Sequence, residues 1–128
     1  MTEIDHGLAV RLKNIYNALH GKAVVVSSEA ALGTLVRNLL TDASLKVEAE
    51  VQIGEGNKDR IDFLVDRIGI ELKTKGSWAE VFRQLERYAL SDKLDAVVLV
   101  TTKRRVASAA RGHSLNGKPV VAICIGAF

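Results

Sequence analysis

The sequence contains one cysteine, one proline and no long apolar run, and each scarcity excludes a class of protein. A single cysteine, Cys124, cannot form an internal disulfide or an all-cysteine zinc site. One proline in 128 residues leaves no room for a proline-rich or collagen-like segment. The longest apolar run, residues 120–125, has six residues, whereas a membrane-spanning helix needs about 20. We therefore expect a soluble globular protein that does not associate with membranes.

The first residues, MTEIDHG, carry acids where a secretory signal peptide has a basic segment, so no export signal is predicted. Together with the scarcity of cysteine, this predicts an intracellular, cytoplasmic location. Hydrophobic residues make up 48% of the chain and charged residues 26%, which is typical of a folded domain rather than a disordered chain. The length suits one hydrophobic core, so we expect a single domain over residues 1–128.

Positive charge is concentrated towards the end of the chain. Residues 103–128 carry five cations and no acid, although the net charge of the whole chain is only +3. The five are Lys103, Arg104, Arg105, Arg111 and Lys118. A basic segment beside a nearly neutral body suits an anionic partner such as nucleic acid. A solvated positive face has the same composition, so charge alone leaves both interpretations open.

Hydrophobic periodicity predicts two helices, three strands and then two helix–strand pairs. In chain order these elements span residues 8–20, 28–43, 45–53, 60–66, 68–74, 77–91, 96–100, 103–111 and 119–125. Residues 45–53 alternate apolar and polar side chains, so we expect that strand to bury one face. An antiparallel meander followed by right-handed crossovers makes a mixed β-sheet flanked by helices, which is an α/β fold.

Two adjacent predicted strands form a hairpin that places two acids side by side. If Asp66 and Arg67 form a two-residue turn, Asp62 lies opposite Glu71. Asp-Arg is an unfavourable pair for such a turn, so a longer loop is the alternative. One face of the hairpin is then apolar throughout, with Ile61, Phe63, Val65, Ile68, Ile70 and Leu72. The other face carries Arg60, Asp62, Leu64, Gly69, Glu71 and Lys73.

This acidic pair has the composition of a metal site. Two carboxylates this close repel each other, which raises the pKa of one of them unless a cation neutralises both. A divalent ion that prefers hard oxygen ligands, Mg²⁺ or Mn²⁺, suits such a pair. Lys73, two residues beyond Glu71, could then orient or deprotonate a water molecule or stabilise a pentavalent phosphate. The alternative is an exposed ladder of Asp62, Lys73 and Glu71 ion pairs that contributes little energy.

Residues on the predicted helices add to this picture. Glu29, at the start of the second helix, projects from the apolar stripe, where a carboxylate is unusual. An acid in the first turn also interacts favourably with the helix dipole, which is a purely structural alternative. Gln84 and Tyr88 lie on the same side of the third predicted helix, which makes them candidate site residues. The alternative interpretation is an ordinary helix surface with Tyr88 partly in the core. Trp78, at helical spacing with Phe82, is interpreted as core, with base stacking as the alternative.

The order of these residues carries a resemblance to a known family. The set is Glu29, Asp62, Glu71-Leu72-Lys73 and Gln84-x-x-x-Tyr88. It resembles the PD-(D/E)XK nuclease superfamily with the trailing Gln-x-x-x-Tyr of RecB-like members, although Ile61 stands where proline is common. The αβββαβ order over about residues 28–101 is similar to the restriction-endonuclease-like core of that superfamily, and the last helix and strand would be an extension.

The resemblance implies a Mg-dependent deoxyribonuclease that hydrolyses phosphodiester bonds. It implies that Asp62, Glu71 and the Leu72 carbonyl hold Mg²⁺ or Mn²⁺. By the same resemblance, Lys73 positions the attacking water and Glu29 assists the metal directly or through water. The residues that would shape the site or contact the DNA backbone are Gln84 and Tyr88.

Candidate contacts to phosphate are the cations near this site and in the basic segment, namely Lys58, Lys75, Arg83, Lys103, Arg104 and Arg105. The short chain favours an endonuclease that acts on DNA structure, as Holliday-junction resolvases do, or a subunit of a larger complex. A homodimer would supply two sites. One alternative is a non-cleaving nucleic-acid-binding or scaffolding domain on the same fold. Another is a protein-interaction module in which the acidic pair forms only ion pairs.

Overall fold

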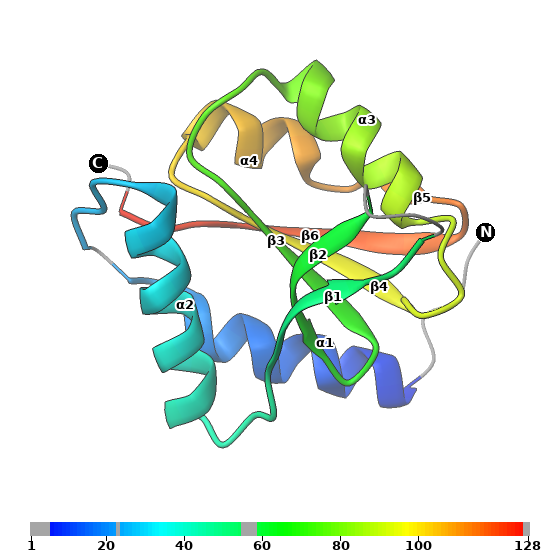
Figure 1. Ribbon diagram of the computed structural model, residues 1–128, viewed down its shortest axis with the longest axis horizontal. Helices are drawn as coiled ribbons and strands as arrows, with labels where there is room; N and C mark the ends of the chain where they lie inside the picture. Colours follow the sequence, from blue (N-terminus) through cyan, green and yellow to red (C-terminus); the bar gives the residue numbers. More distant parts are fainter. Residues whose placement is uncertain (1–5, 23, 55–58, 127–128) are drawn as a thin grey trace.

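Four helices flank a six-stranded mixed β-sheet in the computed structural model, which describes residues 6–22, 24–54 and 59–126 (Figure 1). The helices are α1 (His6–Leu19), α2 (Glu29–Asp42), α3 (Trp78–Tyr88) and α4 (Arg104–Ala110). The strands are β1 (Glu48–Gln52), β2 (Arg60–Val65), β3 (Ile68–Lys73), β4 (Ala96–Thr101), β5 (Ser114–Leu115) and β6 (Lys118–Cys124). The predicted α/β class and order of elements are confirmed, and the short strand β5 is an addition to them.

The sheet has the strand order β1-β2-β3-β4-β6-β5, which places β3 and β4 at its centre. β1, β2 and β3 form an antiparallel meander, whereas β4 is parallel to both β3 and β6. Helices α1 and α2 cover one face of the sheet, and α3 and α4 cover the other (Figure 1). Every residue of β4 is buried, which is typical of a strand covered on both sides.

Two of the helices begin at serine residues whose side chains cap them. Ser28 Oγ accepts a hydrogen bond from Ala31 N at 3.0 Å at the start of α2. Ser77 Oγ accepts one from Glu80 N at 3.3 Å at the start of α3. These caps fix where α2 and α3 start relative to the strands beside them. Within the described residues, no helix has the length and hydrophobicity that crossing a membrane requires.

The β2–β3 hairpin closes through the two-residue turn Asp66-Arg67. Both residues have positive φ angles, 48° and 66°, as a type I′ turn requires. Arg67 belongs to a residue type that rarely adopts this conformation, and its surroundings hold it there. The Arg67 Nε lies 3.2 Å from Asp95 Oδ1, and Asp95 N donates to Arg67 O at 2.7 Å. Arg11 also donates a hydrogen bond to Asp66 O. The predicted turn, and with it the register of the hairpin, is confirmed.

One position interrupts the pairing of β1 with β2. The pairs on either side of it are in register, Ala49–Phe63 and Val51–Ile61. Within the described part of these strands, Glu50 and Asp62 lie between those pairs and have no ladder pairing of their own. Glu50 has a φ of 51°, a left-handed conformation that is uncommon for a residue other than glycine. Such a residue breaks the ladder and turns the strand locally, as a β-bulge does.

The interruption moves the side chains of both strands to the other face of the sheet. On one side of it, Val47 and Phe63 pack with α1 and α2. On the other side, Val51 and Ile61 pack with α3 and α4. Strict alternation would keep all four on one face, so the prediction that Ile61 shares a face with Phe63 is wrong. The prediction of one buried face over residues 45–53 is wrong for the same reason, and also because β1 is a largely exposed edge strand.

Candidate functional site

Asp62 and Glu71 meet where the regular ladder between β2 and β3 ends. The last regular pair on this side of the ladder is Phe63 with Ile70. Beyond it, Asp62 Oδ2 accepts a hydrogen bond from Leu72 N at 2.8 Å, and Glu71 Oε1 accepts one from Asp62 N at 3.3 Å. Each carboxyl group thus binds a backbone N–H of the opposite strand. The structure brings together the two acids that the hairpin register predicts to be opposite each other.

Glu71 is the buried member of the pair. Its exposed fraction is 3%, whereas Asp62 is half-buried. Burial and, next, the neighbouring Asp62 carboxylate raise the pKa of Glu71 to about 9, although the Lys73 ammonium acts in the opposite direction. Without a cation in the site, the Glu71 carboxyl therefore keeps its proton at neutral pH. An exposed ladder of ion pairs does not describe this arrangement, because its central carboxyl is removed from water.

Lys73 lies two residues beyond Glu71, at the end of β3. Its Nζ is 3.7 Å from Glu71 Oε2, and its side chain is 23% exposed. One side of the ammonium therefore faces the buried carboxyl while another remains open to solvent. This position allows the ammonium to contact a water molecule or an anion that approaches the acidic pair.

Tyr88 and Gln84 of α3 connect that helix to the buried carboxyl. Gln84 Nε2 donates to Tyr88 Oη at 2.6 Å, and Tyr88 Oη lies 3.3 Å from Glu71 Oε2 and 3.2 Å from Arg60 O. Burial, followed by the charge of Glu71, raises the pKa of Tyr88 far above its ordinary range, so its hydroxyl stays neutral. Tyr88 is 1% exposed. Tyr88 is therefore a core residue whose hydroxyl contacts Glu71, and Gln84 contacts that hydroxyl from one turn earlier on α3.

Glu29 reaches the same region from the first turn of α2. Its carboxylate accepts a hydrogen bond from Thr74 N at 3.2 Å, directly after β3. Glu29 and Asp62 line one cavity of about 440 Å³. The prediction that Glu29 projects from the buried stripe of its helix is wrong, because the side chain is exposed. Its position at the first turn directs it towards the end of β3 instead of into the core.

Two charged residues of this cavity are additions to the predicted set, Glu50 of β1 and Arg37 of α2. Alternation along β1 assigns Glu50 to the solvent side, and only its left-handed φ angle reveals that the strand turns there. Arg37 follows Glu29 by eight residues, about two helical turns, so helical spacing from Glu29 is the signal that could have found it. The cavity therefore contains three acids and one guanidinium.

The donor set suits a hard divalent cation. Asp62 and Glu71 offer two carboxylates, and Mg²⁺ in proteins commonly takes one or two carboxylates and completes its shell with water and substrate phosphate. Among the residues that the structure describes, no group of three or more His, Cys, Asp or Glu side chains is placed to hold an ion. Glu29 thus does not form a three-acid group with the pair. An ion at Asp62 and Glu71 would need the Leu72 carbonyl, water or substrate as further ligands.

The predicted phosphate contacts lie in different places. Lys58 falls outside the described residues. Lys75 and Lys103 are exposed near the end of β3, where Lys75 lines a cavity of about 420 Å³. Lys103 Nζ donates to Gly76 O at 3.0 Å, so it lies across the loop that follows β3. Arg104 and Arg105 are exposed at the start of α4.

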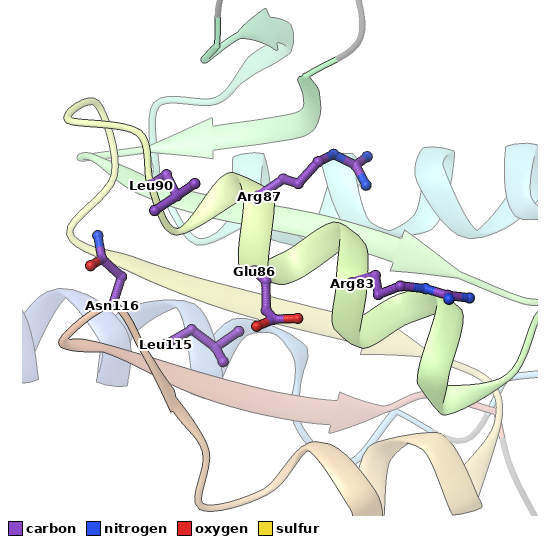
Figure 2. A pocket seen from close by; sticks show the side chains of 6 residues that line it. All are labelled: Arg83, Glu86, Arg87, Leu90, Leu115 and Asn116. Carbon is purple, nitrogen blue, oxygen red and sulfur yellow. The ribbon is translucent and has the colours of Figure 1, made fainter.

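Arg83 occupies a separate surface. It lines a cavity of about 540 Å³ with Glu86, Arg87, Leu90, Leu115 and Asn116 (Figure 2). Figure 2 shows Glu86 pointing from α3 towards Leu115, whereas Arg83 and Arg87 point away from it. The residues that line this cavity include none of the site carboxylates. Arg83 therefore lines a different cavity from Asp62.

Comparison with family models, curated proteins and solved structures gives no match for this chain. The resemblance to the PD-(D/E)XK superfamily therefore depends on the order of the site residues and on their geometry. That geometry consists of the carboxyl pair Asp62–Glu71, the Lys73 ammonium beside it and the Gln84–Tyr88 support from α3.

Proposed function

We propose that the protein is a metal-dependent nuclease that hydrolyses phosphodiester bonds in DNA, with the restriction-endonuclease-like core of the PD-(D/E)XK superfamily. The single observation that carries this proposal is the contact between Asp62 and Glu71 beyond the last regular pair of the β2–β3 ladder. Lys73 lies beside this contact. The proposed activity is that of an endonuclease which acts on DNA structure, and a homodimer would provide two such sites.

The electrostatics of the pair support a cation as its natural partner. A buried carboxyl next to a second carboxylate is costly to ionise, which is why the pKa of Glu71 rises to about 9. A divalent ion bound by Asp62 and Glu71 would remove this cost and displace the Glu71 proton. Metal binding would therefore compete with that proton, and the affinity for Mg²⁺ should increase as the pH rises towards 9.

Each residue of the site has a role in the proposed reaction. When bound by Asp62 and Glu71, Mg²⁺ or Mn²⁺ supplies charge stabilisation at the phosphate and a more acidic water molecule. The Lys73 ammonium orients the water that attacks phosphorus. Tyr88 holds the Glu71 carboxyl in position, and Glu29 holds the backbone that follows Lys73 through its bond to Thr74 N.

A second candidate is a non-cleaving nucleic-acid-binding or scaffolding domain. The observation that favours it is that both acids already have protein partners, since Asp62 binds Leu72 N and Glu71 binds Asp62 N and Tyr88 Oη. Among the described residues, no buried side-chain nitrogen or oxygen atom lacks a hydrogen bond. Such a site is stable without an ion, so this candidate predicts no effect of metal on the protein.

Cleavage assays separate the two candidates. Supercoiled plasmid, linear duplex, single strands and four-way junctions are incubated with the protein in Mg²⁺, Mn²⁺ or EDTA. We expect cleavage with either ion and none in EDTA. Asp62→Asn, Glu71→Gln and Lys73→Ala should each reduce the rate about 100-fold or more, because each removes a group that binds the ion or contacts the attacking water. The matched control is Glu86→Gln, an exposed acid of α3 that should cleave like the wild type.

Two results would count against the nuclease. One is a wild-type protein that cleaves none of the four substrates in any of the three conditions. The other is cleavage by Asp62→Asn and Glu71→Gln at the rate of Glu86→Gln, since this would remove the acidic pair from the reaction. Binding of Mg²⁺ by calorimetry gives an independent readout, and both acid variants should lose it.

A further inference from the structure

An aromatic cluster lies at the surface where the start of α3 meets the loop between α4 and β5. The ring centroid of Trp78 is 5.3 Å from that of Phe82 and 5.4 Å from that of His113, and Phe82 and His113 are 5.6 Å apart. Trp78 and Phe82 are half-buried, and His113 is exposed. The interplanar angles are 61°, 45° and 65°, so no two of these rings cover each other by parallel stacking. The interpretation of Trp78 as a core residue is therefore only partly right.

Cations flank the members of this cluster along the chain. Lys103 Nζ donates to Gly76 O at 3.0 Å, just before α3 begins. Arg104 directly follows Lys103, Arg111 precedes His113 by two residues, and both arginines are exposed. Residues 103–118 include no acid.

We propose that these residues form an aromatic–basic surface that binds single-stranded DNA; its members are Trp78, Phe82, His113, Lys103, Arg104 and Arg111. A base can stack on an aromatic side chain only when it has left the duplex, and such stacking tolerates every base. The cations attract the phosphates of the same strand. Partly exposed rings next to positive charge thus favour a single strand over a duplex, whose bases are already stacked on one another.

The surface begins just beyond the C-terminal end of β3, where Lys73 lies. Residues 74–77 alone connect Lys73 to Trp78, and Thr102 N donates to Lys73 O at 3.4 Å just before α4. A strand held on the aromatic–basic surface therefore leads towards the acidic pair. As an assignment of the substrate form, this inference rests on the proposed function, whereas binding itself is measured without cleavage.

Tryptophan fluorescence tests the proposal directly, because Trp78 is the only tryptophan of the chain. The protein is titrated in EDTA with an oligothymidylate of about 12 nucleotides. We expect the single strand to quench Trp78 emission, and a duplex of equal length to quench it at least tenfold less effectively.

Affinity is also measured by the anisotropy of a labelled oligonucleotide. Trp78→Phe and Phe82→Leu should each weaken binding by roughly tenfold. Lys103→Gln should lower the slope of log affinity against log salt by about 0.7.

The chain offers a matched control in the stacked pair Tyr16 and His20 of α1, whose ring centroids are 4.5 Å apart. Tyr16→Leu should bind the oligonucleotide like the wild type. The proposal is overturned if the oligonucleotide fails to bind or leaves Trp78 emission unchanged. It is also overturned if the duplex quenches equally, or if Tyr16→Leu weakens binding as much as Phe82→Leu. Because all these measurements are made in EDTA, a protein that binds the strand but never cleaves DNA overturns only the nuclease.

Discussion

Glu71 holds a proton in a position that is closed to water, and this proton affects both stability and metal binding. The carboxyl is 3% exposed, with Tyr88 Oη at 3.3 Å and Lys73 Nζ at 3.7 Å. Burial is the main cause of its raised pKa, and the carboxylate of Asp62 is the second. A neutral acid is compatible with the core, whereas an ionised one needs a partner of opposite charge.

The pH dependence of folding should report this proton. The pKa of Glu71 rises from 4.5 to about 9, so the unfolded chain binds fewer protons than the folded chain between those two values. The stability that the protonated carboxyl contributes is therefore complete below pH 4.5 and is lost as the pH rises to about 9, by up to about 1.4 kcal/mol per pH unit. We expect urea unfolding in EDTA to show this fall for the wild type and a much flatter profile for Glu71→Gln.

The control for this prediction is again Glu86→Gln, whose profile should run parallel to that of the wild type. Other titrating groups affect all three proteins equally, so the difference between wild type and Glu71→Gln isolates one carboxyl. Parallel profiles for wild type and Glu71→Gln would show that the carboxyl titrates normally in the folded protein.

At the scale of secondary structure, the irregular position in β1 and β2 determines what Asp62 faces. Glu50 has a left-handed backbone, the ladder is broken at Glu50 and Asp62, and both side chains line the cavity that also contains Glu29. A regular strand would pair these two positions and keep the alternation of side chains intact. The irregular backbone of β1 at Glu50 therefore contributes to the site, because it accompanies the break in the ladder at which Glu50 and Asp62 line the cavity.

Substitutions at Glu50 should reverse the usual preferences of a β-strand. Glu50→Gly relieves the strain of a positive φ and should leave stability unchanged or raise it by about 1 kcal/mol. Glu50→Val should lower stability by more than about 1 kcal/mol, because a β-branched residue tolerates this φ poorly.

Glu48, exposed and regularly paired on the same strand, is the matched control. There, glycine should be the destabilising substitution and valine the tolerated one. Urea unfolding of the four variants measures both effects, and the same order at both positions would contradict the prediction.

Much of the hairpin could be predicted from the sequence, because its information is local. The turn length and the period of two are sufficient to place Asp62 opposite Glu71. The face of the sheet on which Ile61 lies and the contribution of Glu50 to the cavity could not be predicted. No pattern in the sequence indicates that a glutamate within a strand adopts a left-handed conformation. Helical periodicity assigns Glu29 to the buried stripe, but it describes the middle of a helix better than the first turn, from which a side chain can point away from the stripe.

At the scale of the whole molecule, α1 and α2 lie on one face of the sheet and α3 and α4 on the other, with the acidic pair between them. Tyr88 approaches Glu71 from α3, while Glu29 approaches the end of β3 from α2. The mixed α/β arrangement follows from hydrophobic patterning. The contact of Tyr88 with Glu71 depends on how α3 packs across the sheet, which sequence spacing does not determine.

Binding of an ion between these layers should stabilise the entire fold. A ligand that binds only the folded state adds about 2.7 kcal/mol at 100 times its Kd, which corresponds to roughly 10 °C in Tm for a chain of this size. We expect thermal unfolding to shift upwards with Mg²⁺ at pH 8 and to shift less at pH 6, where the Glu71 proton competes with the ion. NaCl at equal ionic strength is the control. Asp62→Asn should abolish the shift, and a wild-type Tm that is indifferent to Mg²⁺ would favour the scaffolding alternative.

Helix α3 carries Trp78 at one end and Tyr88 at the other. Its 11 residues form one unbroken helix, so a tilt of the helix at its first turn would displace its last turn as well. A contact at the surface that shifts the Trp78 end of α3 would therefore change the surroundings of the Glu71 carboxyl, and with them its pKa.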